Sequence, residues 1–261
     1  MRFVDFSLLR MTLAGAIIVL STSYPLTAAD PAEAAKASAK LIRLSPTYEV
    51  WIDKENRRVV LGGAVCLREG QLEMLACLKK TKEHESLVAV NGRAFLAHAG
   101  LVAIGAEPGH PAQFRPQYKA ADGAEIDITI YWNDEKGKRQ QARAQEWLKN
   151  VKTGKEMTER WVFGGSGYWT DRDTGKRFYQ AEEGDFVCVS NFVTAMLDLP
   201  IESSQQSGSL LFEANTTKIP PKGTRVSLVL TPRLKDVPAE RGTDPQIDLL
   251  PLPPEPAEEK Q

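Results

Sequence analysis

Apolar and polar residues alternate along most of the chain between residues 45 and 231, and this pattern predicts β-strands. The clearest run is 125–132, in which every second residue is apolar. Polar and glycine-containing turns separate the runs. The predicted strands cover residues 48–52, 58–67, 72–77, 125–132, 139–148, 161–164, 176–181, 185–189, 210–214 and 224–230. Short turns join the first three strands, so we expect them to form an antiparallel meander.

One segment has helical spacing instead. From Ser86 to about Ile104, apolar residues recur at helical intervals and cover much of the circumference. Ser86 is a suitable N-terminal cap, and Gly105 ends the pattern. We therefore predict one long buried helix with Phe95 near its centre. The expected class is α+β: a mostly antiparallel, meander-like or sandwich-like sheet packed on this helix.

The first 29 residues depart from this pattern. Arg2 and Arg10 are followed by the short uncharged apolar run 11–20, and small residues precede a cleavage point before Asp30. This three-part arrangement is typical of a secretory signal peptide, and the run is shorter than the roughly 20 residues that span a bilayer. We expect residues 1–29 to be removed on export, which places the mature protein in the periplasm or outside the cell. No later segment is apolar enough to span a membrane.

Composition divides the rest of the chain. Residues 30–44, rich in Ala and Lys, are expected to be a mobile leader. Residues 232–261, rich in Pro and acidic residues, predict a disordered tail. One folded domain, residues 45–231, lies between them. The chain has 33 basic and 34 acidic residues, and this balance argues against nucleic-acid binding, which needs a basic surface.

The most unusual cluster of chemically active residues contains three cysteines and a histidine. Cys66 and Cys77 lie close to His84, and Cys188 lies far along the chain. Thiolate and imidazole ligands together favour a transition metal. However, closed zinc sites usually have paired ligands two to four residues apart, and that spacing is absent here. A disulfide with a spare thiol, or three buried thiols, therefore remain as alternatives.

Four further residues are candidates for binding or chemistry. Glu85 either interacts with the start of the predicted helix or acts as a base or metal ligand. His98 lies within that helix and is either a core residue or a ligand. Tyr168 and Trp169 are adjacent aromatic residues beside a glycine-rich loop, so one of them is expected to face solvent and contact a glycan or a peptide.

Several short motifs together resemble the YdjY-like domain of exported bacterial proteins. They are VCLREG at 65–70, KEHES at 82–86, PGHP at 108–111, WVF at 161–163 and CVSNF at 188–192. The resemblance covers roughly residues 47–231. It implies a fold and export from the cytoplasm, and it implies no activity.

Two functions follow from these observations. The first is an exported, non-catalytic binding or assembly module whose partner is a cell-envelope protein or glycan, because no catalytic constellation can be assembled from the motifs. The second is a metal-binding or redox-associated protein that uses Cys66, Cys77, Cys188 and His84. On these grounds we do not expect an enzyme.

Overall fold

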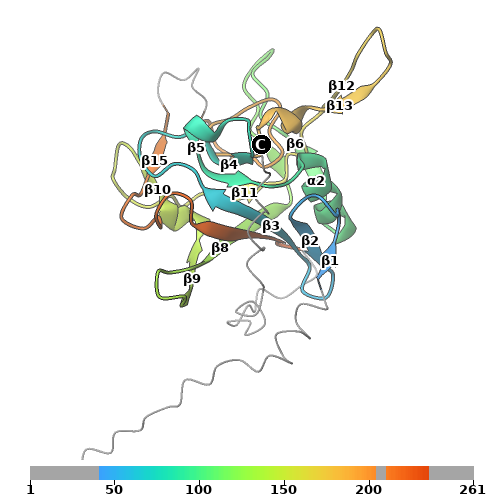
Figure 1. Ribbon diagram of the computed structural model, residues 1–261. Coiled ribbons are helices and arrows are strands. Elements are labelled where there is room, and N and C mark those ends of the chain that lie inside the picture. Colours follow the sequence, from blue (N-terminus) through green and yellow to red (C-terminus); the bar gives the residue numbers. More distant parts are fainter. Residues whose placement is uncertain (1–40, 204–209, 235–261) are drawn as a thin grey trace, which may run out of the picture.

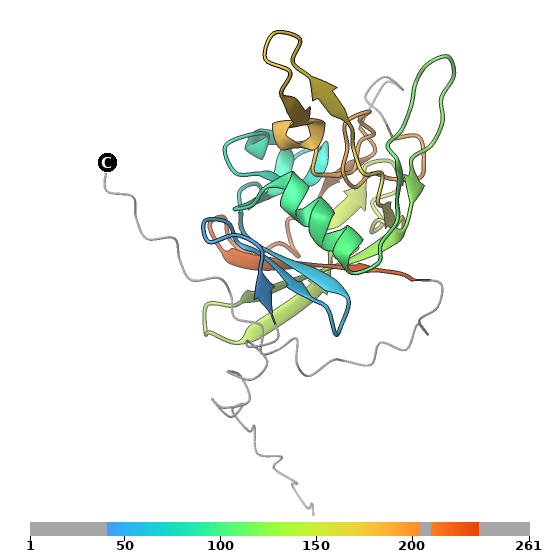
Figure 2. The same ribbon diagram turned by 90° about the vertical axis from the view of Figure 1, so that its right-hand side faces the viewer.

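The structure, a computed structural model, describes residues 41–203 and 210–234. Its largest element is a ten-stranded sheet, and one α-helix crosses part of that sheet (Figures 1 and 2). The α+β class with mostly antiparallel pairing is therefore confirmed. The predicted signal peptide, most of the leader and nearly all of the tail lie outside the described residues.

The main path of the large sheet runs in the order β11-β8-β16-β3-β5-β4-β14. Strands β1 and β2 extend it beside β3, and β9 extends it beside β8. Its strands are β1 (Ile42–Arg43), β2 (Val50–Asp53), β3 (Arg58–Val65), β4 (Met74–Leu78), β5 (Ser86–Val90), β8 (Glu125–Asn133), β9 (Arg139–Arg143), β11 (Trp161–Val162), β14 (Val187–Cys188) and β16 (Arg225–Pro232).

Three two-stranded sheets and four helical segments complete the described part. The small sheets pair β6 (Pro108–His110) with β7 (Asp122–Gly123), β10 (Leu148–Asn150) with β15 (Phe212–Ala214), and β12 (Tyr168–Thr170) with β13 (Arg177–Tyr179). The helical segments are η1 (Glu83–Glu85), α2 (Ala94–Ala103), η2 (Ala144–Trp147) and η3 (Gln180–Glu183). None of the helices in the described ranges is long and apolar enough to cross a membrane.

The predicted meander is correct for its first pair only. Strands β2 and β3 are antiparallel neighbours, but β5 lies between β3 and β4. Strand β5 runs parallel to β4, whereas the other strand pairs of the described chain are antiparallel. The connection between these two parallel strands is short, because only residues 79–85 separate them.

The prediction of a long helix from Ser86 to Ile104 is wrong. Ser86–Val90 is strand β5, and only Ala94–Ala103 is helical. Ser86 does not cap a helix; its hydroxyl donates to the carbonyl oxygen of Lys82. An apolar run inside a sheet and an apolar helix have no distinct periodicity over a few residues, so the pattern merged the two elements.

Three small residues and one leucine form the buried face of α2. Ala94, Ala97, Gly100 and Leu101 are buried, while Phe95 is 44% exposed. A Cβ atom at Gly100 would lie 3.1 Å from side-chain carbons of both Ile52 and Val59, so the helix packs closely on β2 and β3. This close approach turns Phe95 outward, contrary to its predicted place in the core.

The limits of the sheet differ slightly from the predicted domain limits. Strand β1, at Ile42–Arg43, pairs with β2, although it falls within the stretch expected to be a mobile leader. At the other end, β16 runs to Pro232. The sheet therefore includes a few residues beyond each end of the predicted domain 45–231.

The difference between the two faces of α2 gives a direct test of this packing. Leu101→Ala is expected to cost about 2–5 kcal/mol of unfolding free energy, because Leu101 is fully buried. Phe95→Ala is expected to cost less than about 1 kcal/mol, because the ring is already partly in water. Urea unfolding of both variants measures the difference. Equal losses would contradict the orientation of the helix.

Candidate functional site

Most of the thiol and charged side chains considered as candidates lie on or beside the short connection between β4 and β5, residues 79–85. It folds back on itself through side-chain hydrogen bonds to backbone carbonyls. The Thr81 hydroxyl donates to Leu78 O at 2.6 Å, and the Ser86 hydroxyl donates to Lys82 O at 2.7 Å. These bonds hold η1 over the start of β5, where the connection meets residues of β3 and β4.

Two of the three cysteines meet beside this connection. Cys66 directly follows β3 and Cys77 lies in β4, on opposite sides of β5. The Cys66 thiol donates to Ser86 O at 3.1 Å and also lies within hydrogen-bonding reach of the Cys77 sulfur. All three cysteines are free thiols in the structure.

The two thiols differ in acidity. The proximity of the Cys66 thiol and of the Ser86 and Thr81 hydroxyls lowers the pKa of Cys77 to about 7, and burial opposes this fall. The same contact and burial raise the pKa of Cys66, and the nearby carboxylate of Glu83 adds to that rise. The two thiols therefore titrate as a pair, and their contact favours the loss of only one of the two protons.

Cys66 also opens onto a pocket of about 430 Å³. Three basic side chains and one acidic side chain line it, together with small residues of β3 and β5. The lining residues are Ala64, Val65, Cys66, Lys79, Glu83, Ala89, Asn91, Lys222, Gly223 and Arg225. Cys77 is fully buried, so Cys66 is the thiol of the pair that reaches this pocket.

Three carboxylates surround Lys82 at the other side of the connection. The Lys82 ammonium lies 2.8 Å from Asp185 Oδ1 and 3.6 Å from Glu85 Oε1. Burial and the neighbouring Glu85 raise the pKa of Glu73 to about 7, and Lys82 opposes this rise. Protonated Glu73 therefore donates to Glu85 near neutral pH.

Cys188 and His84 lie apart from the thiol pair's pocket. Cys188 is fully buried in a small cluster with Met74, Cys77 and Ala195, and burial raises its pKa well above the usual range. The His84 side chain is 78% exposed, with its Nε2 at 3.9 Å from Glu85 Oε2. Within residues 41–203 and 210–234, no group of three or more His, Cys, Asp or Glu side chains is arranged to hold a metal ion.

His98 is part of a hydrogen-bonded chain that fixes a loop. Its Nδ1 lies 2.9 Å from the Tyr179 hydroxyl, which donates to Gly165 O at 3.0 Å. Burial lowers the pKa of His98, so the ring is neutral and donates to Tyr179. The ring also packs edge-on against Phe163. This arrangement supports the interpretation of His98 as a core residue.

Tyr168 and Trp169 lie on a hairpin that projects from the molecule, which we call the aromatic arm (residues 168–179; Figures 1 and 2). Tyr168 is 52% exposed, Trp169 46% and Phe178 42%. Trp169 stacks on its cross-strand neighbour Phe178, with ring centroids 4.8 Å apart. Both adjacent aromatic residues therefore reach solvent, one from each face of the hairpin.

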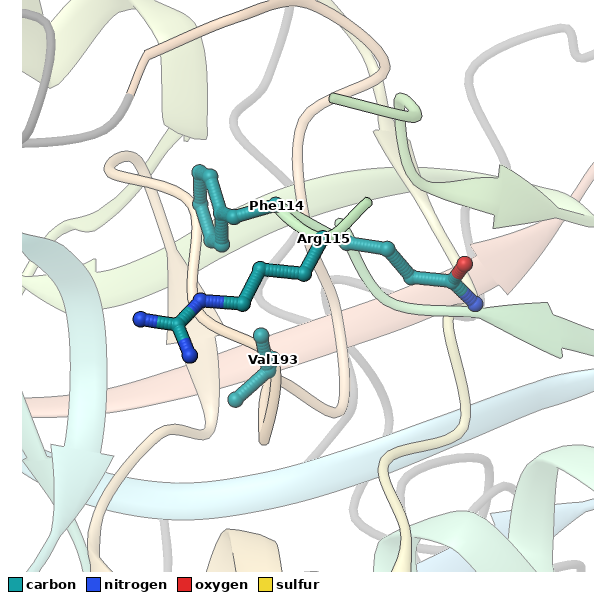
Figure 3. Close-up of a pocket in the computed structure, with 4 residues that line it drawn as sticks. Phe114, Arg115 and Val193 are labelled. Carbon is teal, nitrogen blue, oxygen red and sulfur yellow. The ribbon is translucent and has the colours of Figure 1, made fainter. Parts of the chain in front are cut away.

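A second pocket, of about 420 Å³, lies beside the loop between β6 and β7. Figure 3 shows the Arg115 side chain extended between the Phe114 ring and Val193. Gln113 completes the lining. None of the candidate residues from the sequence contributes to this pocket.

Several residues of these sites were missed by sequence reasoning. Asp185 lies far along the chain from Glu73 and Lys82, and only the fold brings it to the Lys82 ammonium. Phe178 carried a usable signal, because the turn at 171–175 makes it the cross-strand neighbour of Trp169. The pairing of Cys66 with Cys77 across β5 required the correct strand order.

A family model described as the YdjY domain matches residues 50–231. Because this match covers more than half of the chain, the protein belongs to the YdjY domain family, as the sequence motifs indicated. Searches of curated proteins and of solved structures found no match. The matched range includes both the thiol pair and the aromatic arm.

The acidity of Glu73 predicts a pH-dependent stability. The unfolded chain loses this proton near pH 4.5 and the folded chain near pH 7, so the carboxyl destabilises the fold as pH rises through that window. Glu73→Gln keeps a donor for Glu85 without the charge. We expect the variant to be more stable than wild type by roughly 1–3 kcal/mol at pH 8 and about equal at pH 4.5.

Urea unfolding across this pH range measures the effect. Glu69→Gln is the matched control, because Glu69 is exposed and lies only four positions away. Its stability difference from wild type should not change with pH. If the stability difference between Glu73→Gln and wild type did not change with pH, the raised pKa of Glu73 would be contradicted.

Proposed function

We propose that the protein is an exported binding or assembly module and that the aromatic arm is its contact surface. The observation that carries this proposal is the set of three large aromatic side chains left in solvent on one hairpin. Burying such rings in the core would stabilise the fold. Their exposure is therefore explained by a partner that covers them in the complex. Binding, and not catalysis, is the function this surface supports.

The arm is held in one conformation before any partner arrives. At its base, Gln180 N donates to Gly167 O at 2.9 Å, and the Tyr179 hydroxyl is fixed by Gly165. At its tip, the Asp171 carboxylate accepts from Thr174 N at 2.7 Å. A fixed conformation lowers the entropy cost of association, which favours tight binding by a small surface.

The chemistry of the arm favours a protein partner over a glycan. Arg177 lies over the Tyr168 ring, 4.6 Å from its centroid, next to the Trp169–Phe178 stack. Trp, Tyr and Arg are the residue types that dominate the binding energy of protein interfaces. We therefore propose a cell-envelope protein as the partner, with the Trp169 ring as the anchor.

Affinity capture with matched variants tests the arm. The mature chain is immobilised and exposed in parallel to solubilised envelope proteins and to purified envelope polysaccharide. Trp169→Ala/Phe178→Ala is expected to lower recovery of the partner protein at least about tenfold, because truncating interface aromatics usually costs more than 1–2 kcal/mol. Val193→Ala, which trims another exposed apolar side chain, should leave recovery unchanged.

The thermal midpoint is measured for each variant, and it should move little because the Trp169 and Phe178 side chains lie outside the core. Equal recovery by wild type and the double variant would overturn the arm as the contact surface. Retention of polysaccharide alone would overturn the choice of a protein partner. Recovery of nothing above background by wild type would count against a binding module.

Export is a separate part of the proposal and rests on residues 1–29. In cells that make the full-length chain, we expect the protein in the envelope or medium fraction to begin at Asp30. N-terminal sequencing or intact mass of that fraction measures this. A chain that retains Met1 and remains in the cytoplasm would contradict export.

A further inference from the structure

The pocket beside Cys66 combines a thiol with an excess of positive charge. Lys79, Lys222 and Arg225 line it against the single carboxylate of Glu83. Arg225 is paired with Glu49 at 2.6 Å, so the excess positive charge comes from Lys79 and Lys222. A pocket with this lining attracts small anions, and its thiol is the one reactive group among the lining side chains.

We propose that Cys66 is a nucleophilic thiol that forms a mixed disulfide with a small anionic disulfide bound in this pocket, and that Cys77 accepts its proton. This function goes beyond the proposed binding module and uses none of the arm residues. It is also a more specific form of the redox function inferred from the sequence, because it uses two of the three cysteines and requires no metal.

The hydrogen bonds around the pair provide a path for the proton. The Cys66 thiol has two acceptors within reach, Ser86 O at 3.1 Å and the Cys77 sulfur. The Ser86 hydroxyl carries one proton and lies near both Lys82 O and Cys77, so it can turn toward the sulfur when that sulfur is charged. The lowered pKa of Cys77 is consistent with a base at this position.

The reaction balances without an outside oxidant other than the disulfide itself. The Cys66 sulfur attacks one sulfur of the bound disulfide while its proton passes to the Cys77 thiolate. The new S–S bond joins Cys66 to one half of the ligand, and the other half leaves as a thiolate. That thiolate takes the proton from Cys77, so one protein thiol and one disulfide become one mixed disulfide and one free thiol.

The strand order explains why the reaction stops at the mixed disulfide. Cys66 directly follows β3 and Cys77 lies in β4, on opposite sides of β5, and two strand spacings amount to about 9.6 Å. A disulfide needs Cα atoms within about 6.8 Å of each other. Attack of Cys77 on the modified Cys66 would therefore require movement of β3 or β4, and the pair acts as nucleophile and base instead.

The experiment measures the reaction of the mature chain with two disulfide probes at neutral pH. One is the dianionic 5,5′-dithiobis(2-nitrobenzoate), and the other is the uncharged 4,4′-dithiodipyridine. Intact mass and peptide mapping should show one adduct, on Cys66, and none in Cys66→Ser. Cys77→Ala should slow both probes about tenfold or more, because the base is lost. Cys188→Ala, which removes a buried thiol outside the pocket, should react like wild type.

The charge of the pocket is tested with Lys79→Gln/Lys222→Gln. We expect the dianionic probe to react several-fold more slowly with this variant and the uncharged probe to be unaffected, since only the first is attracted by the lysines. Lys152→Gln, an exposed lysine in another turn, is the control. Added salt should reduce the difference between the two probes in wild type.

Each other outcome overturns the proposal. An adduct on Cys77 or Cys188 would show that Cys66 is not the nucleophile. A loss of two mass units would show that the product is a Cys66–Cys77 disulfide and not a mixed disulfide. An unchanged rate in Cys77→Ala removes the base. Cys77→Ser is a second variant that controls for a packing defect. If Cys77→Ala and Cys77→Ser both keep the wild-type thermal midpoint, their slower reaction reports the loss of the base. The arm variant Trp169→Ala/Phe178→Ala should react like wild type, which separates this proposal from the binding function.

Discussion

The short connection between the parallel strands β4 and β5 is the constraint on which the thiol pair and the carboxylates around Lys82 depend. Parallel neighbours usually need a crossover of a dozen or more residues, but here residues 79–85 suffice because side-chain hydroxyls satisfy the turning backbone. The connection inserts β5 between β3 and β4, and this insertion sets the distance between Cys66 and Cys77. It also brings Lys82 and Glu85 against Glu73. A longer crossover helix would leave these groups apart.

The sequence was informative about strands and misleading about the helix, for a physical reason. Alternation identified runs such as 125–132 because one strand face is buried and the other is not. Around Ser86–Ile104, buried strand and helix have the same apolar composition, so their boundary was invisible. The large residue Phe95 was expected in the core but is exposed, whereas Gly100 is buried because the side chains of Ile52 and Val59 lie directly against it. Three small residues together with Leu101 marked the packed face of α2.

The candidate sites were foreseen in part. Cys66 and Cys77 were singled out by residue type, and Tyr168 and Trp169 by their position beside glycine. The contacts that give them chemistry were not foreseen, because a hydrogen bond across β5 and a stack across a hairpin depend on strand order and register. Whether His84 and Cys188 take part in metal binding stays a prediction; the structure places one in solvent and the other in the core.

The exposure of Trp169 has a spectroscopic consequence. Of the five tryptophans, Trp147 and Trp161 are fully buried and Trp51 and Trp132 are partly covered, so Trp169 is the one most open to water. Its indole emission should be the most red-shifted and the most accessible to a soluble quencher such as acrylamide. The chain thus carries its own fluorescent reporter on its proposed contact surface, and covering of the arm can be followed in real time without attaching a dye.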